Sequence, residues 1–174
     1  MLNIEVLEVL GDEPVTVLEA KEYCKIDNDY VAEDSLIEDL IRSARASIEN
    51  YANISLVEKR IRVFSDTDKT LWLPCSPVIE ILSVSDENDE PLGFDAALKY
   101  KIKVNHAGSF FVTYRAGFQP LPPDLKLAVL KQVLTDYDNR ENFTISNNST
   151  VRAGSQLSNS TKVLVHPYNR NLLL

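Results

Sequence analysis

The strongest pattern in the sequence is a stripe of apolar positions in residues 29–51. These positions recur at spacings of 1, 3 and 4, and they are Leu36, Ile37, Leu40, Ile41, Ala44, Ile48 and Tyr51. This spacing places them on one side of a helix with a period of 3.6 residues. The pattern predicts a long amphipathic helix that begins at Asp29 or Tyr30, or later if Ser35 and Glu38 form a capping box.

Two further helices are indicated by their starts. Thr16 and Glu19 have the spacing of a capping box, which predicts a short helix at about residues 17–24. The segment Leu121-Pro-Pro-Asp124 predicts the start of a second long helix, because proline is tolerated in a first turn. This helix is expected to end at about Arg140 and to pack its apolar side against the first long helix.

The middle of the chain is rich in β-branched and aromatic residues. Short segments bounded by turn residues lie at 60–65, 70–73, 78–85, 100–104 and 109–114, and a strand-like segment at Asn3–Leu10 opens the chain. Period-two alternation in several of them indicates strands with one buried face. We expect antiparallel strands, mostly in hairpins.

The composition changes again near the C-terminus. Residues 141–160 are mainly Asn, Ser, Thr and Gly, with too few large apolar side chains to bury, so they predict a flexible arm. A short apolar segment at 162–165 and the sequence His166–Arg170 follow. A polar arm that ends in an apolar tail is typical of a segment that orders on a partner.

These elements predict an α+β fold. Its small helical core has two long packed helices plus a short one, with an antiparallel β insertion at about residues 60–115 between the long helices and a flexible C-terminal arm. We expect an α+β domain at residues 1–141 and an arm with a docking segment at 142–174.

Charge excludes several classes of partner. The formal net charge is -8 and the isoelectric point about 4.8. Binding to nucleic-acid phosphates or to an anionic membrane needs an excess of Lys and Arg, so neither is expected. We see no signal peptide and no apolar run near the ~20 residues that span a bilayer.

Candidate chemistry is sparse. His106 and His166 fall in turn-like sequences and are interpreted as surface residues, and Cys24 and Cys75 as reduced structural thiols. The sequence contains neither a nucleophile elbow nor a Gly-rich phosphate loop. The acidic stretch that starts at Asp27 has no oxygen ligand and glycine at the positions that an EF-hand requires. We therefore expect no catalytic residue, no cofactor and no metal site.

An ordered set of short segments runs through nearly the whole chain. They are Thr16-Val-Leu-Glu-Ala-Lys21, Ile26-Asp-Asn-Asp29, Asp34-Ser-Leu-Ile-Glu-Asp-Leu-Ile41, Ala44-Arg-Ala-Ser-Ile-Glu-Asn-Tyr51, Leu73-Pro-Cys-Ser-Pro-Val78, Val112-Thr-Tyr-Arg-Ala-Gly117, Leu121-Pro-Pro-Asp124, Tyr137-Asp-Asn-Arg140 and Val163-Leu-Val-His-Pro-Tyr168. Together they resemble the head–tail connector proteins of tailed bacteriophages, also called head-completion or adaptor proteins, over about residues 15–170.

The resemblance implies a structural subunit and not an enzyme. It implies a ring of about a dozen copies that joins portal to tail or neck proteins, with no sequence-specific nucleic-acid binding and no membrane. The protein would lie in the virion neck, or in the bacterial cytoplasm when a prophage encodes it. Another phage neck or tail-completion protein is the alternative, followed by an enzyme or metal-dependent binding module.

Candidate interface residues are aromatic, basic or apolar positions in the β region, at the end of the second long helix and in the tail. They are Trp72, Tyr137, Arg140, Val163, Leu164, Tyr168 and Arg170.

Overall fold

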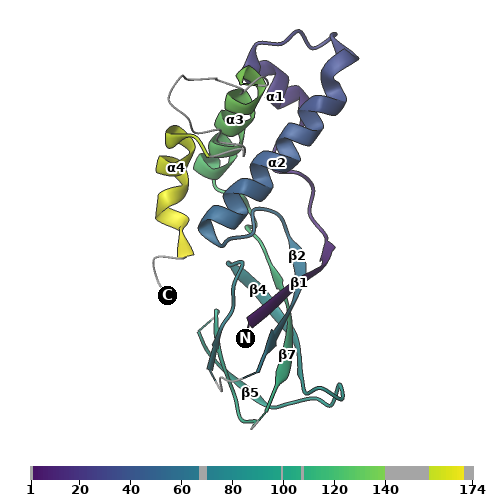
Figure 1. The fold of residues 1–174 in the computed structure, drawn as a ribbon, viewed down its shortest axis with the longest axis vertical. Coiled ribbons are helices and arrows are strands. Elements are labelled where there is room, and N and C mark those ends of the chain that lie inside the picture. Colours follow the sequence, from purple (N-terminus) through teal and green to yellow (C-terminus); the bar gives the residue numbers. More distant parts are fainter. Residues whose placement is uncertain (1, 67–69, 99, 107, 140–156, 171–174) are drawn as a thin grey trace, which may run out of the picture. The chain divides into compact units, whose positions relative to one another are not determined.

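The computed structural model describes residues 2–66, 70–98, 100–106, 108–139 and 157–170. The chain forms two compact units, each assembled from separate stretches of sequence (Figure 1). One contains residues 1–12, 53–121 and 170–174, and we call it the β unit. The other contains residues 13–52 and 122–169, and we call it the helical unit.

The described residues of the helical unit form four α-helices and two 3₁₀ turns. They are α1 (Val17–Cys24), η1 (Val31–Glu33), α2 (Asp34–Ala52), α3 (Pro123–Asp138), α4 (Asn159–Val165) and η2 (His166–Tyr168). Helix α3 packs against α2 and α4, and α1 contacts both α2 and α3. The predicted pair of long packed helices with a short one is confirmed, and the β insertion lies between the long helices as expected.

The core of the helical unit comes from the two amphipathic stripes. The buried residues of α2 include Ile37, Ile41, Ala44, Ile48 and Ala52. Those of α3 are Leu125, Ala128, Val129, Gln132 and Val133. The 3.6-residue period therefore identified the centre of the buried face of α2. At its margins Leu36 is exposed, and Leu40 and Tyr51 are half-buried.

The starts of α1 and α2 differ in how well they could be predicted. The Thr16 hydroxyl accepts a hydrogen bond from the Glu19 amide at 3.2 Å, and the Glu19 carboxylate accepts one from the Thr16 amide at 3.0 Å. This confirms the first capping box. Helix α2 instead continues directly from η1 and begins at Asp34, so Ser35 lies inside it and does not cap it. The conditional second capping box therefore does not form. Helical structure begins at Val31 with η1, close to the predicted start at Asp29 or Tyr30.

In the β unit, the described strands form two antiparallel sheets. The first has the order β1 (Leu2–Val9), β2 (Lys59–Ser65), β7 (Phe110–Ala116) and β4 (Val78–Ser85). The second has the order β3 (Thr70–Trp72), β6 (Lys101–Val104) and β5 (Phe94–Leu98). The antiparallel pairing confirms the prediction, but β1–β2, β2–β7, β4–β7 and β3–β6 join strands far apart in sequence. The expectation of mostly hairpins was wrong, because pairing here is set by long-range contacts.

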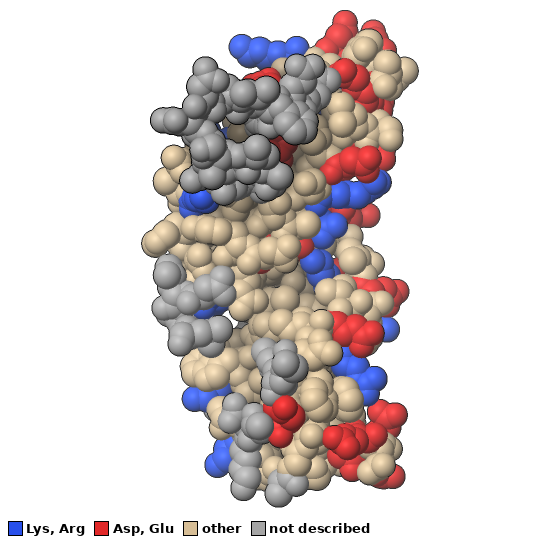
Figure 2. Space-filling model, viewed as in Figure 1, with Lys and Arg blue, Asp and Glu red and all other residues tan. Residues whose placement is uncertain are grey.

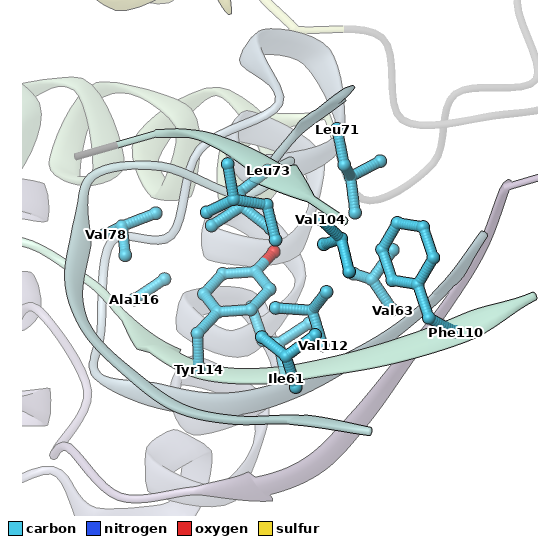
Figure 3. Packing of buried hydrophobic residues seen from close by; sticks show 12 residues of the cluster. Ile61, Val63, Leu71, Leu73, Val78, Val104, Phe110, Val112, Tyr114 and Ala116 are labelled. Carbon is cyan, nitrogen blue, oxygen red and sulfur yellow. The ribbon is translucent and has the colours of Figure 1, made fainter. Parts of the chain in front are cut away.

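Both sheets contribute to one buried cluster in the β unit (Figure 3). Its members are Ile61, Val63, Leu71, Leu73, Val78, Val84, Ile102, Val104, Phe110, Val112, Tyr114 and Ala116. Figure 3 shows the Tyr114 ring inside this cluster, with its hydroxyl directed toward Leu73. That hydroxyl donates to the Pro74 carbonyl at 2.7 Å, and burial raises the pKa of Tyr114. The buried phenol thus keeps a hydrogen-bond partner, which its burial requires.

The C-terminal segment departs from the prediction of a flexible arm. Residues 157–160 were assigned to that arm, but Leu157 is buried and Ser158 caps α4 by accepting from the Thr161 amide. The Ser158 amide also donates to Gln132 at 3.0 Å. Gln132 thus anchors the start of α4 to α3, which a composition argument does not detect. The rest of the predicted arm, residues 141–156, lies outside the described residues.

Candidate assembly surfaces

An aromatic and cationic surface lies on the smaller sheet of the β unit. Trp72, at the end of β3, is 41% exposed. Its ring stacks on Tyr100 with 5.6 Å between centroids, and Lys101 Nζ lies 4.6 Å from the Trp72 ring centroid. The guanidinium of Arg170 lies 5.3 Å from the centroid of Tyr100. Two of the predicted interface residues, Trp72 and Arg170, are therefore joined through Tyr100.

This arrangement suits a protein partner. Cations over aromatic faces are attracted by the ring quadrupole, and exposed Trp, Tyr and Arg are the residue types enriched at the centres of interfaces. Tyr100 is not among the interface residues predicted from the sequence. Its position between two lysines, Lys99 and Lys101, was the available signal.

In the helical unit, the tail is fastened by a tyrosine. The Tyr168 hydroxyl donates to the two carboxylate oxygens of Asp124 at 2.9 and 2.8 Å. Asp124 lies in the first turn of α3, so this bond closes η2 onto the start of that helix. The hydrogen bond to Asp124 raises the pKa of Tyr168, and some burial adds to the shift.

Helix α4 has two different faces. Thr161 and Val165 are fully buried, and Leu164 is half-buried. Val163 is 72% exposed, which is the largest exposed fraction among the large apolar residues that the structure describes. An apolar side chain this exposed on a helix whose other face is anchored is available to a partner.

For Tyr137 and Arg140, the structure offers less support for a place at an interface. Tyr137 is half-buried, and its hydroxyl donates to the Glu33 carboxylate of η1 within the helical unit. Arg140 lies outside the described residues. Their role at an interface stays a prediction.

The acidic connector before α2 is organised by one buried lysine. Lys21 is 2% exposed, and its Nζ donates to the Asn28 carbonyl at 3.1 Å and pairs with the Asp34 carboxylate. A buried ammonium needs such partners because of the cost of its desolvation. The carboxylate of Asp34 therefore balances an internal charge.

Charges of both signs are interspersed on the face shown in Figure 2, without an extended basic cluster there. Among the residues that the structure describes, no group of three or more His, Cys, Asp or Glu side chains is arranged to hold a metal ion. Within the same residues, every helix is too short or too polar to span a bilayer.

The tail is anchored to α3, Trp72 is exposed on an aromatic pair, and Val163 is exposed on α4. These are features of a protein that works through contacts with other proteins, and we class it as a structural assembly protein. The family model described as "Phage gp6-like head-tail connector protein" matches residues 14–168, so the chain belongs to this family of head–tail connectors. It is a structural virion protein and not an enzyme. No curated protein matches the chain.

Solved structures with the same fold come from gene transfer agent (GTA) particles. A chain in "Neck of empty GTA particle computed with C6 symmetry" has a TM-score of 0.70 and 22% identity, covering 97% of this chain and 95% of that one. A chain in "Virion of native gene transfer agent (GTA) particle" has a TM-score of 0.69 and 19% identity, covering 95% and 94%. A chain in "Neck of native GTA particle computed with C12 symmetry" has a TM-score of 0.63 and 20% identity, covering 97% and 94%.

Proposed function

We propose that copies of this protein form a closed ring in the neck of a phage or phage-like particle, between the portal and the tail. The observation that carries the proposal is the similarity of fold, over nearly the full length of both chains, to chains from neck structures computed with sixfold and twelvefold symmetry. The ring has about a dozen subunits, as the resemblance implies. When a prophage encodes the protein, it is made in the bacterial cytoplasm before it enters the particle.

An acidic ring suits the passage of DNA. Attraction between Lys or Arg and the phosphates supplies most of non-specific DNA affinity. A chain with a formal net charge of -8 avoids a strongly attractive channel. DNA therefore passes the ring without being held by it.

The C-terminal segment is proposed to dock on the portal or on a tail or neck protein. Val163 is the side chain best suited to this contact, because it is highly exposed on a helix that Ser158 and Gln132 anchor. Val163→Asp should weaken binding to the portal or to the tail or neck protein, whichever this segment contacts, without lowering stability. Leu18→Asp, which adds the same charge at an exposed apolar position on α1, is the matched control and should bind as the wild type does.

Light scattering with and without portal protein tests the ring. We expect the full chain to form a higher-order species in the presence of portal rings, whether or not it assembles alone. A chain that stays monomeric at every concentration, with the partner and without it, contradicts the proposal.

A further inference from the structure

Strand β1 differs from the strands beside it in how its apolar side chains are covered. It is the outermost strand of the larger sheet, where it pairs with β2. Ile4 lies opposite Val63, and Val6 lies opposite Ile61. Residues directly opposite in an antiparallel pair project from the same face of the sheet. Ile4 and Val6 therefore continue the apolar face that forms the core of the β unit.

On that face, the side chains are buried as far as β2 but not on β1. Ile61 and Val63 are fully buried, whereas Ile4 is 42% and Val6 48% exposed. Three more large apolar side chains of this segment are exposed: Leu7, Val9 and Leu10. Large apolar side chains exposed together along one segment of a soluble protein mark an interaction site.

On the opposite face of β1, charged side chains lie opposite charged side chains of β2. Glu5 lies opposite Arg62, and Glu8 lies opposite Arg60, whose guanidinium is 3.2 Å from the Glu8 carboxylate. The strand thus has one face with a charge pair and one apolar face that the described residues leave partly exposed. Its outer edge presents backbone groups, and a long apolar edge strand is a template for pairing with another chain.

We propose that β1 is a contact surface between subunits and that a second copy of this chain covers it. The proposal rests on the ring inferred above, in which each subunit meets two copies of itself. Permanent contacts between identical subunits are more apolar than contacts with exchangeable partners, which fits the aliphatic side chains of β1.

The strand order also favours a copy of the same chain. The pairs β1–β2, β2–β7 and β7–β4 are all antiparallel, so the two outer strands, β1 and β4, run in opposite directions. When two identical sheets are placed head to tail, β1 of one copy therefore lies beside β4 of the next. These two strands are antiparallel, as are all the pairs within the sheet. Contacts of this heterologous kind form a ring when the rotation between copies closes.

The test compares full-length Val6→Arg with Leu18→Arg, a control of similar exposure on α1 of the helical unit. Mass photometry with portal rings would measure assembly, and circular dichroism would check folding. We expect Val6→Arg to lower ring formation by about tenfold or more, as hot-spot substitutions do. Leu18→Arg should assemble as the wild type does. Equal assembly of both variants, or equal loss in both, overturns the proposal.

Hydrogen exchange of the wild-type chain gives a second measurement that does not depend on a variant folding. Amides of β1 should exchange several-fold more slowly in the ring than in the monomer. Protection that appears when single subunits bind portal, before any ring forms, would assign β1 to the portal and overturn the proposal. A wild-type chain that never forms rings contradicts the proposed function itself, and the inference falls with it.

Discussion

The helical unit and the β unit are stabilised by contacts of different range in the sequence. In the helical unit, many polar contacts are local: the box between Thr16 and Glu19, or the pairs of Arg42 with Glu38 and Asp39 within α2. In the β unit, the strands pair across long separations, as β1 does with β2 and β2 with β7.

This difference determines how many elements a single substitution destabilises in each unit. Helix α1 has its own capping box and α2 has its own apolar stripe, so a single change weakens one element. A strand such as β7 is paired on both sides, with β2 and β4, and a change there disturbs three strands at once.

The largest effects should come from equivalent core truncations, one in each unit. Ile48 in α2 and Ile61 in β2 are both fully buried. Ile→Ala at either position should lower the free energy of unfolding by about 2–5 kcal/mol, through lost burial and a new cavity. Trp72 is the single tryptophan and lies in the β unit, so its fluorescence follows that unit, whereas circular dichroism at helical wavelengths follows the other.

Ile61→Ala should shift the fluorescence transition more, because the buried cluster that contains Ile61 has no member from the helical unit. Ile48→Ala should shift the dichroism transition more. If either variant moves both transitions equally, the two units unfold as one and the comparison fails.

A glycine substitution in the β unit should have the next largest effect. Gly117 has φ of 147°, and a Cβ there would lie 2.7 Å from the Glu58 Cα and from the Val57 carbonyl oxygen. Gly117→Ala should therefore cost about 1–3 kcal/mol of backbone strain. Gly93→Ala is the matched control, because an added Cβ there meets nothing within 4 Å. Urea titrations that give the two variants equal stability would refute the close approach at Gly117.

Loss of the helix cap should have a smaller effect, confined to the helical unit. Thr16→Ala removes the acceptor for the Glu19 amide and should cost about 1 kcal/mol. Thr16→Ser keeps the hydroxyl and should retain most of that stability. Thermal unfolding followed by circular dichroism measures both. The capping account is contradicted if the serine variant is as unstable as the alanine variant.

The smallest effect should come from pH. The hydrogen bond from Lys126, followed by that from the Thr16 amide, lowers the pKa of Glu19 below its ordinary value of 4.5. Folding therefore favours the carboxylate, and this stabilisation is complete above about pH 4.5 and is lost as the pH falls through the lowered pKa. Glu19→Gln should be less stable than the wild type at pH 7, with the difference shrinking at pH 3. A difference that stays constant between these pH values would exclude the role of Glu19.

Local signals explain which parts of the fold could be predicted. The capping residue Thr16 and the stripe from Ile37 to Ile48 identified α1 and the buried face of α2, because both depend on residues within a few turns. Strand β5 was missed because its sequence, Phe94-Asp-Ala-Ala-Leu98, contains none of the β-branched residues that identify strands. The strand order could not be predicted, because it depends on which distant segments pair.

The candidate surfaces were predicted only in part, because they too depend on residues that are far apart in the sequence. Trp72 and Arg170 were selected one by one, but Tyr100, which lies between them, became visible only in the tertiary structure. The anchoring of Ser158 by Gln132 joins positions 26 residues apart in sequence, which no periodicity reports. Hence composition assigned residues 157–160 to a flexible arm.

Electron microscopy of the full-length chain mixed with portal rings tests the central claim most directly. The account predicts a closed ring of this protein on one side of the portal, coaxial with it, with neighbouring copies in contact through β1. Portal rings that carry no added density, or that carry isolated copies without contact between neighbours, would contradict it.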